Sequence, residues 1–255
     1  MRNELDRLEG YILAAGVANR TGYLGALLPK TLLPVKGKPL LWYSLLTAAQ
    51  VGVSHATVVT SPTWSIVRRY VRELTVPSEG LESIRTVVLR RKTAGPVETL
   101  LRVLPRHTDD FCVVFGDDYT KGRNVGMLQK KVRQSDAMVA ELVVREDSVR
   151  RMTQSCSVKL RRDGLITCIE EKPHRPKPGY RGCGVYYFRG STFRSLVEEA
   201  VPKNHSLTMT DLVEVATRQH RAYGIVLDGL NVNVNTLGDF VTALTAEGDD
   251  VDCPL

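Results

Sequence analysis

The feature that most constrains this fold is the regular alternation of two kinds of segment up to about residue 145. Short apolar runs rich in β-branched residues alternate with longer segments whose apolar residues recur at helical spacing. Strands that alternate with helices form βαβ units, in which parallel strands are covered by helices on both faces. The pattern predicts strands at Gly10–Ala15, Ala56–Thr60, Thr86–Leu89, Phe111–Phe115 and Ala137–Val144, and helices at Pro39–Gln50, Thr63–Leu74, Val97–Leu104 and Asn124–Gln134.

The second half of the chain has a different pattern, with short strands separated by turn signals and a proline-rich basic loop over residues 172–179. We expect strands at Ser155–Arg161, Leu165–Glu170, Gly184–Phe188 and Ala222–Leu227, and helices at Thr192–Ala200, Thr210–His220 and Leu237–Ala246. No repeat or linker divides the 255 residues, so one domain over residues 1–255 is expected. Ligands of such a sheet bind at the carboxyl ends of its strands.

Composition narrows the class of protein. The chain is 43% hydrophobic and 25% charged, which is typical of a folded globular protein. No apolar run approaches the ~18 residues that span a membrane, so no membrane partner is expected. The first residues lack the apolar centre of a signal peptide, which predicts a cytoplasmic location.

Charge and cysteine content point to small anionic ligands. The net charge of +7 is spread over short basic groups. Aromatic residues make up only 6% of the chain and are not interleaved with those groups, so nucleic-acid binding is not expected. The five cysteines form no C-x-x-C pair, and four lie in apolar stretches (112, 156, 168 and 183), where we expect small buried thiols rather than disulfides or a zinc site.

The most informative segment begins where the first strand ends. Leu13, Ala14, Ala15 and Gly16 are followed by Arg20 and Lys30. Small side chains let backbone N–H groups approach phosphate closely, while Arg supplies a forked donor and Lys a mobile charge. By themselves these residues leave two interpretations open, a phosphate-binding loop or an ordinary connection with incidental charges.

The wider pattern resembles the sugar-phosphate nucleotidyltransferases, also called nucleotide-sugar pyrophosphorylases. Their L-A-A-G-x-G-x-R signature matches residues 13–20 except that Ala18 replaces the second glycine, and P-K-x-L-L-P-V-x-G-K-P-L matches residues 29–40 in full. Further motifs follow in order over nearly the whole chain: Gly95–Thr99, the strand ending in Gly116-Asp117, Glu171-Lys172-Pro173, the segment Tyr180–Phe188, and Asn231–Thr236.

The resemblance assigns a role to each matched position. It implies nucleotide binding by Leu13, Ala14, Ala15, Gly16, Arg20 and Gly95; catalysis by Arg20, Lys30 and Asp117; acceptor binding by Glu171, Lys172 and Gly182; and Mg²⁺ binding by Asp117 and Asn233. Asn233 stands where the family usually has a second metal carboxylate. Arg90 stands where a glutamine often precedes the base-contacting segment, so the choice of base does not carry over.

The fold expected from pattern and resemblance is α/β: a Rossmann-like mixed, mostly parallel sheet with helices on both faces and a small β-rich acceptor-binding part. Residues of about 10–135 would form the nucleotide-binding half and about 136–246 the acceptor-binding half. The implied reaction joins an NTP and a sugar 1-phosphate with release of pyrophosphate. Two alternatives stay open: a cytidylyltransferase acting on a non-sugar phosphate or phosphonate, and a catalytically silent nucleotide-binding regulatory subunit. Homo-oligomerisation also stays open.

Several of these residues also have a purely structural interpretation. Acidic residues after a strand, such as Asp117 and Asp118, commonly form turns or cap helices. We assign metal binding to Asp117 and a turn to Asp118. Glu171 and Lys172 could be a surface ion pair of little energetic weight. The run 90–92 could be solvated surface or a rim that attracts phosphate, and Asn233 could simply turn the chain before its helix.

Overall fold

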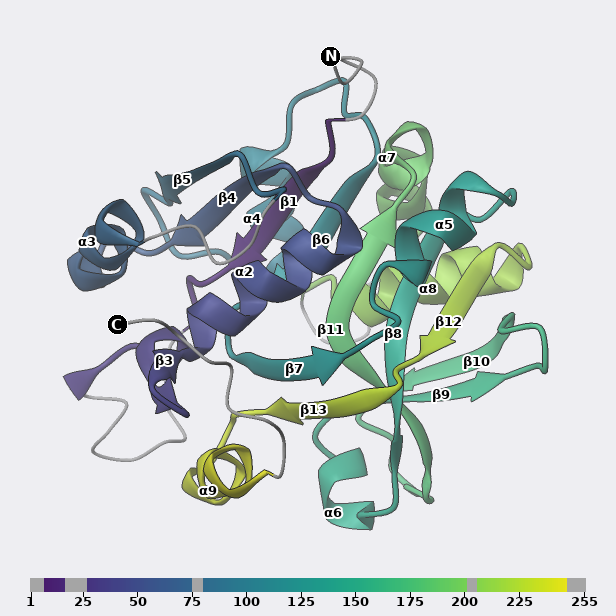
Figure 1. Cartoon of the computed structure of the whole chain (residues 1–255). Coiled ribbons are helices and arrows are strands. Elements are labelled where there is room, and N and C mark those ends of the chain that lie inside the picture. The colour runs from purple at the N-terminus through teal and green to yellow at the C-terminus, as the bar shows by residue number, and fades with distance from the viewer. Residues whose placement is uncertain (1–6, 17–26, 75–79, 201–205, 247–255) are drawn as a thin grey trace.

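The computed structural model of the chain describes residues 7–16, 27–74, 80–200 and 206–246. Its centre is a mixed sheet in the order β10-β9-β11-β6-β1-β4-β5, with β8 paired to β11 and β12 paired to β8 (Figure 1). Seven of the nine strands of this sheet run in the same direction, and β10 and β11 run in the opposite direction. The strands are β1 (Glu9–Leu13), β4 (His55–Thr60), β5 (Ser83–Val88), β6 (Phe111–Phe115), β8 (Val139–Glu146), β9 (Cys156–Leu160), β10 (Ile166–Glu171), β11 (Gly179–Phe188) and β12 (Ala222–Val226).

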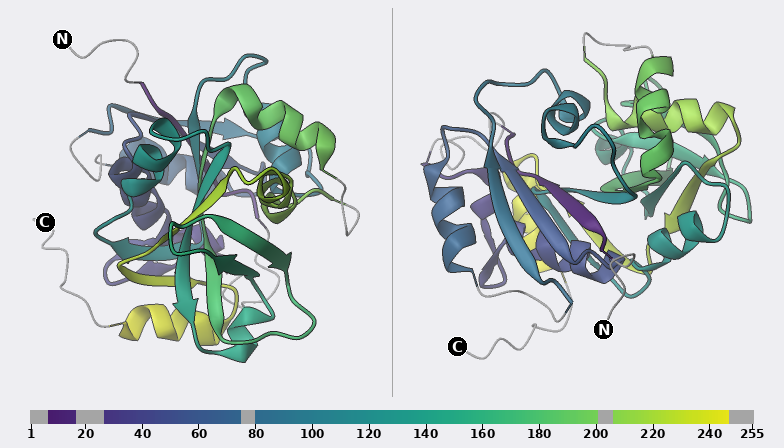
Figure 2. Two further views of the ribbon diagram at one scale, coloured as in Figure 1. Left: turned by 90° about the vertical axis from the view of Figure 1, so that its right-hand side faces the viewer. Right: turned by 90° about the horizontal axis from the view of Figure 1, so that it is seen from above.

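Helices cover both faces of the sheet because its central strands are apolar on both sides (Figure 2). Consecutive residues of β1 alternate between the two cores: Tyr11 packs in one and Ile12 in the other. One face carries α2 (Leu40–Val51), α3 (Ser65–Glu73) and α5 (Met127–Arg133), and the other carries α4 (Pro96–Val103), α7 (Gly190–Glu199) and α8 (Met209–Arg218). The expected architecture is therefore confirmed.

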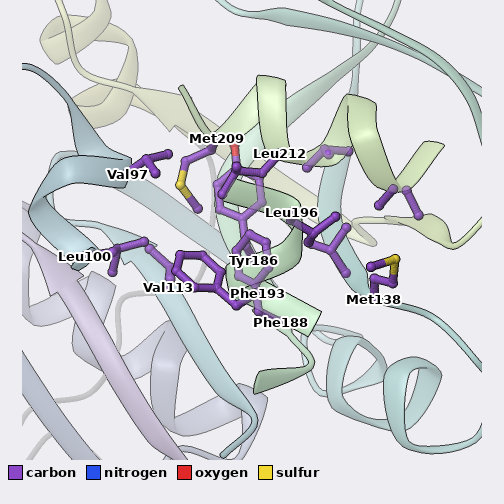
Figure 3. Close-up of a cluster of buried hydrophobic side chains, with 14 of the residues drawn as sticks. Val97, Leu100, Val113, Met138, Tyr186, Phe188, Phe193, Leu196, Met209 and Leu212 are labelled. Carbon is purple, nitrogen blue, oxygen red and sulfur yellow. The ribbon is translucent and has the colours of Figure 1, made fainter. Parts of the chain in front are cut away.

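The core beneath α4, α7 and α8 contains a group of packed aromatic rings among aliphatic side chains (Figure 3). Phe111 stacks on Phe188 with ring centroids 5.5 Å apart, and Phe193 meets both rings edge-on. Such contacts add to the free energy gained by removing these large rings from water. This core joins the parallel half of the sheet to the antiparallel strand β11.

A smaller layer completes the fold below the main sheet. Strands β7 (Asp118–Gly122) and β13 (Gly229–Asn233) form an antiparallel pair, and α9 (Leu237–Thr245) packs beside them. A short hairpin of β2 (Pro34–Val35) and β3 (Lys38–Pro39) follows the 3-10 helix η2 (Lys30–Leu32) and closes this layer. Because β7 directly follows β6, this layer lies at the carboxyl end of the parallel strands.

Several of the sequence-based expectations were wrong. β7, β13, the β2–β3 hairpin and the short helix α6 (Val149–Met152) were not anticipated, and β11 begins five residues earlier than expected. Cys112, Cys156 and Cys183 are buried, but Cys168 is exposed because β10 lies at the edge of the sheet, so the expectation of a buried thiol was wrong there. Asp118 is the first residue of β7 rather than a turn residue. No helix in the described ranges is long and apolar enough to cross a membrane.

Candidate functional site: two cavities that meet at Asp117

Two cavities open at the carboxyl ends of the parallel strands. The larger, of about 580 Å³, is lined by residues that directly follow β1, β4, β5 and β6. The smaller, of about 360 Å³, is lined mainly by the second half of the chain. Both cavities are lined by Pro96, Phe115 and Asp117. Asp117 therefore lies where ligands in the two cavities would meet.

The larger cavity gathers most of the residues predicted to bind nucleotide. Leu13, Ala15, Gly16, Lys30 and Gly95 line it. Gly95 immediately precedes α4, and the N–H groups of a helix's first turn can bind an anion. Arg90 and Arg91 are exposed at the rim, with Trp64 among the other lining residues.

One residue predicted to bind nucleotide does not line the cavity, and another lies outside the described residues. Ala14 is buried, and its backbone N–H donates to the carbonyl of Val59 at 2.8 Å, so its role there is to hold β1 against β4. Arg20, with the neighbouring Ala18, lies outside the described residues.

Lys30 and Asp117 form the central ion pair of the site. Lys30 Nζ lies 2.8 Å from Asp117 Oδ2 and also donates to Asn235 Oδ1 at 3.0 Å and to the Val234 carbonyl at 3.3 Å. Their side chains are only 12% and 24% exposed, so solvent screens this pair weakly. Three segments far apart in sequence are thereby tied together around one ammonium group.

Two asparagines lie close to this ion pair, Asn233 at the end of β13 and Asn235 just beyond it. Asn233 lines the smaller cavity and pairs in register with Asp118 on β7. Asn235 Nδ2 donates to Asn233 Oδ1, so the two amides orient each other. Asn235 was missed by sequence reasoning, although it stands within the late motif. Asn235 stands at the position where the D-x-G-T segment has glycine, and an amide side chain at that position is the signal that could have pointed to it.

Asp118 is fully enclosed directly behind Asp117. Burial and the negative charge of Asp117 raise the pKa of Asp118 well above its ordinary value, while the positive charge of Arg181 opposes that shift. Gly184 adopts φ +66° at a bulge in β11, and a Cβ there would collide with Asp118 Oδ2. A glycine is needed at this position for both reasons.

The smaller cavity brings together all three residues predicted to bind the acceptor, Glu171, Lys172 and Gly182. Glu171 Oε2 accepts a 2.6 Å hydrogen bond from Thr210, and Glu171 Oε1 lies 3.8 Å from Lys172 Nζ. Lys172 adopts φ +45°, an unusual conformation for a residue with a side chain, immediately after β10. Such strain is concentrated at functional positions, which agrees with a ligand-binding role.

A buried carboxyl group that none of the sequence motifs predicted lies behind Gly182. Glu141 on β8 is fully buried, and its Oε1 accepts a hydrogen bond from the thiol of Cys156 at 3.7 Å. A Cβ on Gly182 would collide with that carboxylate. Burial raises the pKa of Glu141 to about 8, so the group is mainly protonated at neutral pH.

The residues at the junction fit a hard divalent cation. Asp117 offers a carboxylate and Asn233 an amide oxygen, which are oxygen ligands of the kind that Mg²⁺ prefers. The ammonium of Lys30 already rests on Asp117, which shows that this position favours positive charge. The described residues hold no cluster of three or more His, Cys, Asp or Glu side chains that could form a complete metal cage.

Comparison with known proteins identifies similar chains. The profile described as nucleotidyl transferase matches residues 9–243. A glucose-1-phosphate thymidylyltransferase of Neisseria meningitidis is 25% identical over 181 residues, covering 71% of this chain and 61% of that protein. The corresponding enzyme of Streptomyces antibioticus is 26% identical over 185 residues, covering 71% of this chain and 49% of that protein. This chain thus spans between half and three-fifths of the length of these relatives.

A solved structure shows the same fold. The UDP-glucose pyrophosphorylase complexed with UDP-glucose superposes with a TM-score of 0.79 over 94% of this chain and 98% of that chain, at 17% identity.

Proposed function

Since this chain belongs to the nucleotidyl transferase family, we propose that it transfers a nucleoside monophosphate from an NTP to a sugar 1-phosphate and releases pyrophosphate. The observation that carries this proposal is the junction of two cavities at Asp117. One cavity is assigned to the NTP and the other to the acceptor. The reaction requires that the phosphates of the two substrates come together. Among the residues that line the two described cavities, only Pro96, Phe115 and Asp117 line both, and Asp117 is the charged one.

The proposed reaction does not need a strong general base. A phosphate oxygen of the acceptor attacks the α-phosphorus of the NTP in line, the bond to the β-phosphate oxygen breaks, and pyrophosphate leaves. The attacking oxygen is already anionic, so catalysis depends on positioning and on neutralising two polyanions. The net charge of +7 suits such substrates.

Lys30 supplies the positive charge that this chain itself places at the junction. Its ammonium group is held by Asp117 and Asn235 and would neutralise charge near the α-phosphate. Asp117 and Asn233 would hold Mg²⁺, which when bound supplies further positive charge beside the same phosphate. Arg20 is assigned to the leaving pyrophosphate by its motif.

The acceptor would bind in the smaller cavity. Lys172 would bind the acceptor phosphate, and Glu171, whose orientation is fixed by Thr210, would accept hydrogen bonds from sugar hydroxyls. Gly182 would offer backbone atoms to the acceptor along β11. A neutral, protonated Glu141 behind Gly182 keeps a second negative charge away from the phosphate at neutral pH.

The proposal is tested by supplying ATP, CTP, GTP, UTP and dTTP, each with glucose 1-phosphate, N-acetylglucosamine 1-phosphate or a non-sugar phosphate. Pyrophosphate release and the mass of the product are measured with Mg²⁺ and with excess chelator. We expect Mg²⁺-dependent product with at least one sugar 1-phosphate. Transfer only to the non-sugar phosphate would favour the cytidylyltransferase alternative. Nucleotide binding without transfer to any acceptor would favour a regulatory subunit.

A further inference from the structure

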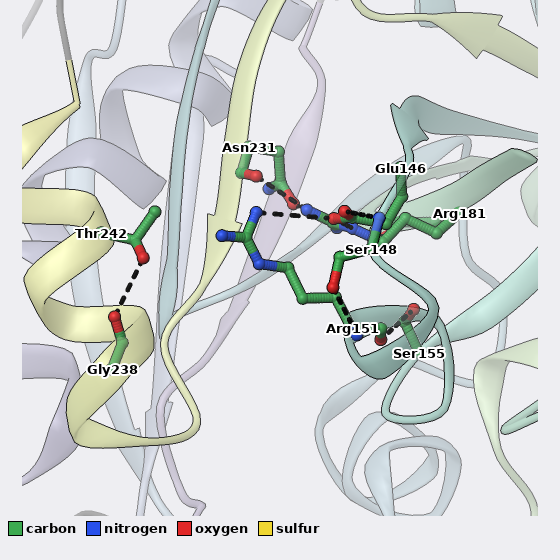
Figure 4. A network of polar contacts seen from close by, with 9 residues as sticks. Glu146, Ser148, Arg151, Ser155, Arg181, Asn231, Gly238 and Thr242 are labelled. Atoms are coloured by element: carbon green, nitrogen blue, oxygen red, sulfur yellow. Dashed lines mark hydrogen bonds and ion pairs between the residues drawn. The ribbon is translucent and has the colours of Figure 1, made fainter. Parts of the chain in front are cut away.

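Three cationic side chains line the smaller cavity: Arg151, Lys172 and Arg181. The acceptor-binding motif accounts only for Lys172. Arg151 lies on α6 and Arg181 on β11, and neither was singled out from the sequence. The two arginines share one counter-charge, Glu146, and they use it unequally (Figure 4).

Arg181 has a structural role, because its guanidinium N–H groups already donate to other residues of the protein. Its side chain is only 5% exposed, and its Nε lies 3.1 Å from Glu146 Oε2. Nη1 donates to Asn231 Oδ1 and Nη2 donates to the Asn231 carbonyl, both at 2.7 Å. Asn231 in turn donates to Thr120 Oγ1, so Arg181 fastens β11 to the β7–β13 layer. Little of this guanidinium is left for a ligand.

Arg151 is held far more loosely. Its Nη1 lies 3.7 Å from the same Oε2 atom of Glu146 that Arg181 already uses, and Glu146 Oε1 accepts from the backbone N–H of Ser148. Within the described residues the Arg151 guanidinium makes no side-chain hydrogen bond, and the side chain is 46% exposed on the cavity wall. Glu146 carries one negative charge and faces two arginines, Arg151 and Arg181. One positive charge therefore has no counter-charge of its own, and we assign it to Arg151, the more distant of the two.

The surrounding backbone fixes where Arg151 points. Ser148 caps α6 by accepting from the Arg151 N–H, and Ser155 Oγ donates to the Arg151 carbonyl. The backbone N–H of Lys172 donates to the Ser155 carbonyl at 3.0 Å, so the segments carrying the two cations adjoin. Figure 4 shows the Arg151 side chain extending from α6 toward Asn231 on β13, the strand that ends at Asn233.

We propose that Arg151 is an anion-binding residue of the acceptor cavity, which holds the phosphate of the acceptor together with Lys172. This inference rests on the proposed function. A phosphate between Lys172 and β13 would supply the counter-charge that Arg151 lacks, and a guanidinium can bind two phosphate oxygens at once. Arg151 would thereby orient the attacking oxygen toward the junction at Asp117.

The test compares Arg151→Ala with Arg150→Ala, since Arg150 is an exposed neighbour that does not line either cavity. With glucose 1-phosphate as the acceptor probe, Arg151→Ala should raise the acceptor KM by ~10-fold or more while the NTP KM changes by less than ~2-fold. Arg151→Lys should restore part of the loss. Arg150→Ala should match the wild type in both constants.

A second measurement does not depend on turnover. Inorganic phosphate should raise the Tm of the wild type and of Arg150→Ala by more than that of Arg151→Ala, because a ligand that binds more weakly stabilises the folded state less. If the wild type turns over and Arg151→Ala leaves the acceptor KM unchanged, the inference is overturned while the proposed function stands. If no acceptor reacts, the proposed function fails, and the phosphate titration alone decides. Equal phosphate stabilisation of all three proteins, or none in the wild type, overturns the inference.

Discussion

Replacing Glu141 by glutamine tests the energetic cost of the carboxyl group buried behind Gly182. Burial raises its pKa from the ordinary 4.5 to about 8. Between these values the folded protein keeps a proton that the unfolded chain has already released, so folded-state stability falls as pH rises. Glutamine has nearly the same shape but does not titrate, and this cost should therefore be absent in Glu141→Gln.

The size of the effect follows from the same pKa values. Each unit of pKa shift corresponds to about 1.4 kcal/mol, so over the full interval the cost reaches about 5 kcal/mol. The unfolding free energy of Glu141→Gln, relative to the wild type, should accordingly rise steadily from pH 4.5 to pH 8 and level off above that. Taking the difference between two proteins cancels the contributions of titrating groups that lie far from Glu141.

Urea unfolding of both proteins at pH 5, 6.5, 8 and 9 measures this difference. The control is Glu170→Gln, which removes an exposed carboxylate from β10 of the same sheet. We expect a strong dependence on pH for Glu141→Gln and little for the control. A difference between wild type and Glu141→Gln that stays constant from pH 5 to pH 9 would refute the reasoning, because it would mean that burial does not hold the proton on Glu141.

Three further predictions concern the junction and its support. Asp117→Asn should lower kcat by at least ~100-fold in a pyrophosphate-release assay, and undiminished turnover in excess chelator would contradict the metal assignment. Asn233→Asp should keep measurable activity and tighten Mg²⁺ binding by calorimetry, whereas Asn233→Ala should lower kcat by ~10-fold; unchanged affinity in both would leave Asn233 only a structural residue at the end of β13. Arg181→Met should cost ~3–5 kcal/mol in urea unfolding by leaving Glu146 buried without its closest cation, against less than ~0.5 kcal/mol for the exposed Arg161→Met; equal losses would refute this.

The sequence by itself determined the parallel half of the sheet. Apolar runs and helical periodicity are local patterns, and the helix at Pro39–Gln50 and the strand at Phe111–Phe115 agree with α2 and β6 within one residue. The motifs also singled out five residues that the structure brings to the walls of two adjoining cavities: Lys30, Asp117, Glu171, Lys172 and Gly182. Local spacing suffices here because the carboxyl ends of parallel strands meet at one edge of the sheet.

Only the tertiary structure decided which further residues join them. Strands β7 and β13 carry few apolar residues and come from segments about a hundred residues apart, so no local pattern announces their pairing. That pairing places Asn235 against Lys30 and Asn231 against Arg181. Likewise, the pKa of Glu141 is raised because the folded chain buries it, although hydrogen bonds from Cys156 and Tyr186 oppose the shift. Arg151 has only a distant contact with Glu146 because Arg181 lies closer to that carboxylate. How deeply a residue is buried, and which charged groups lie beside it, depend on its neighbours in space. The spacing of residues along the sequence does not specify these neighbours.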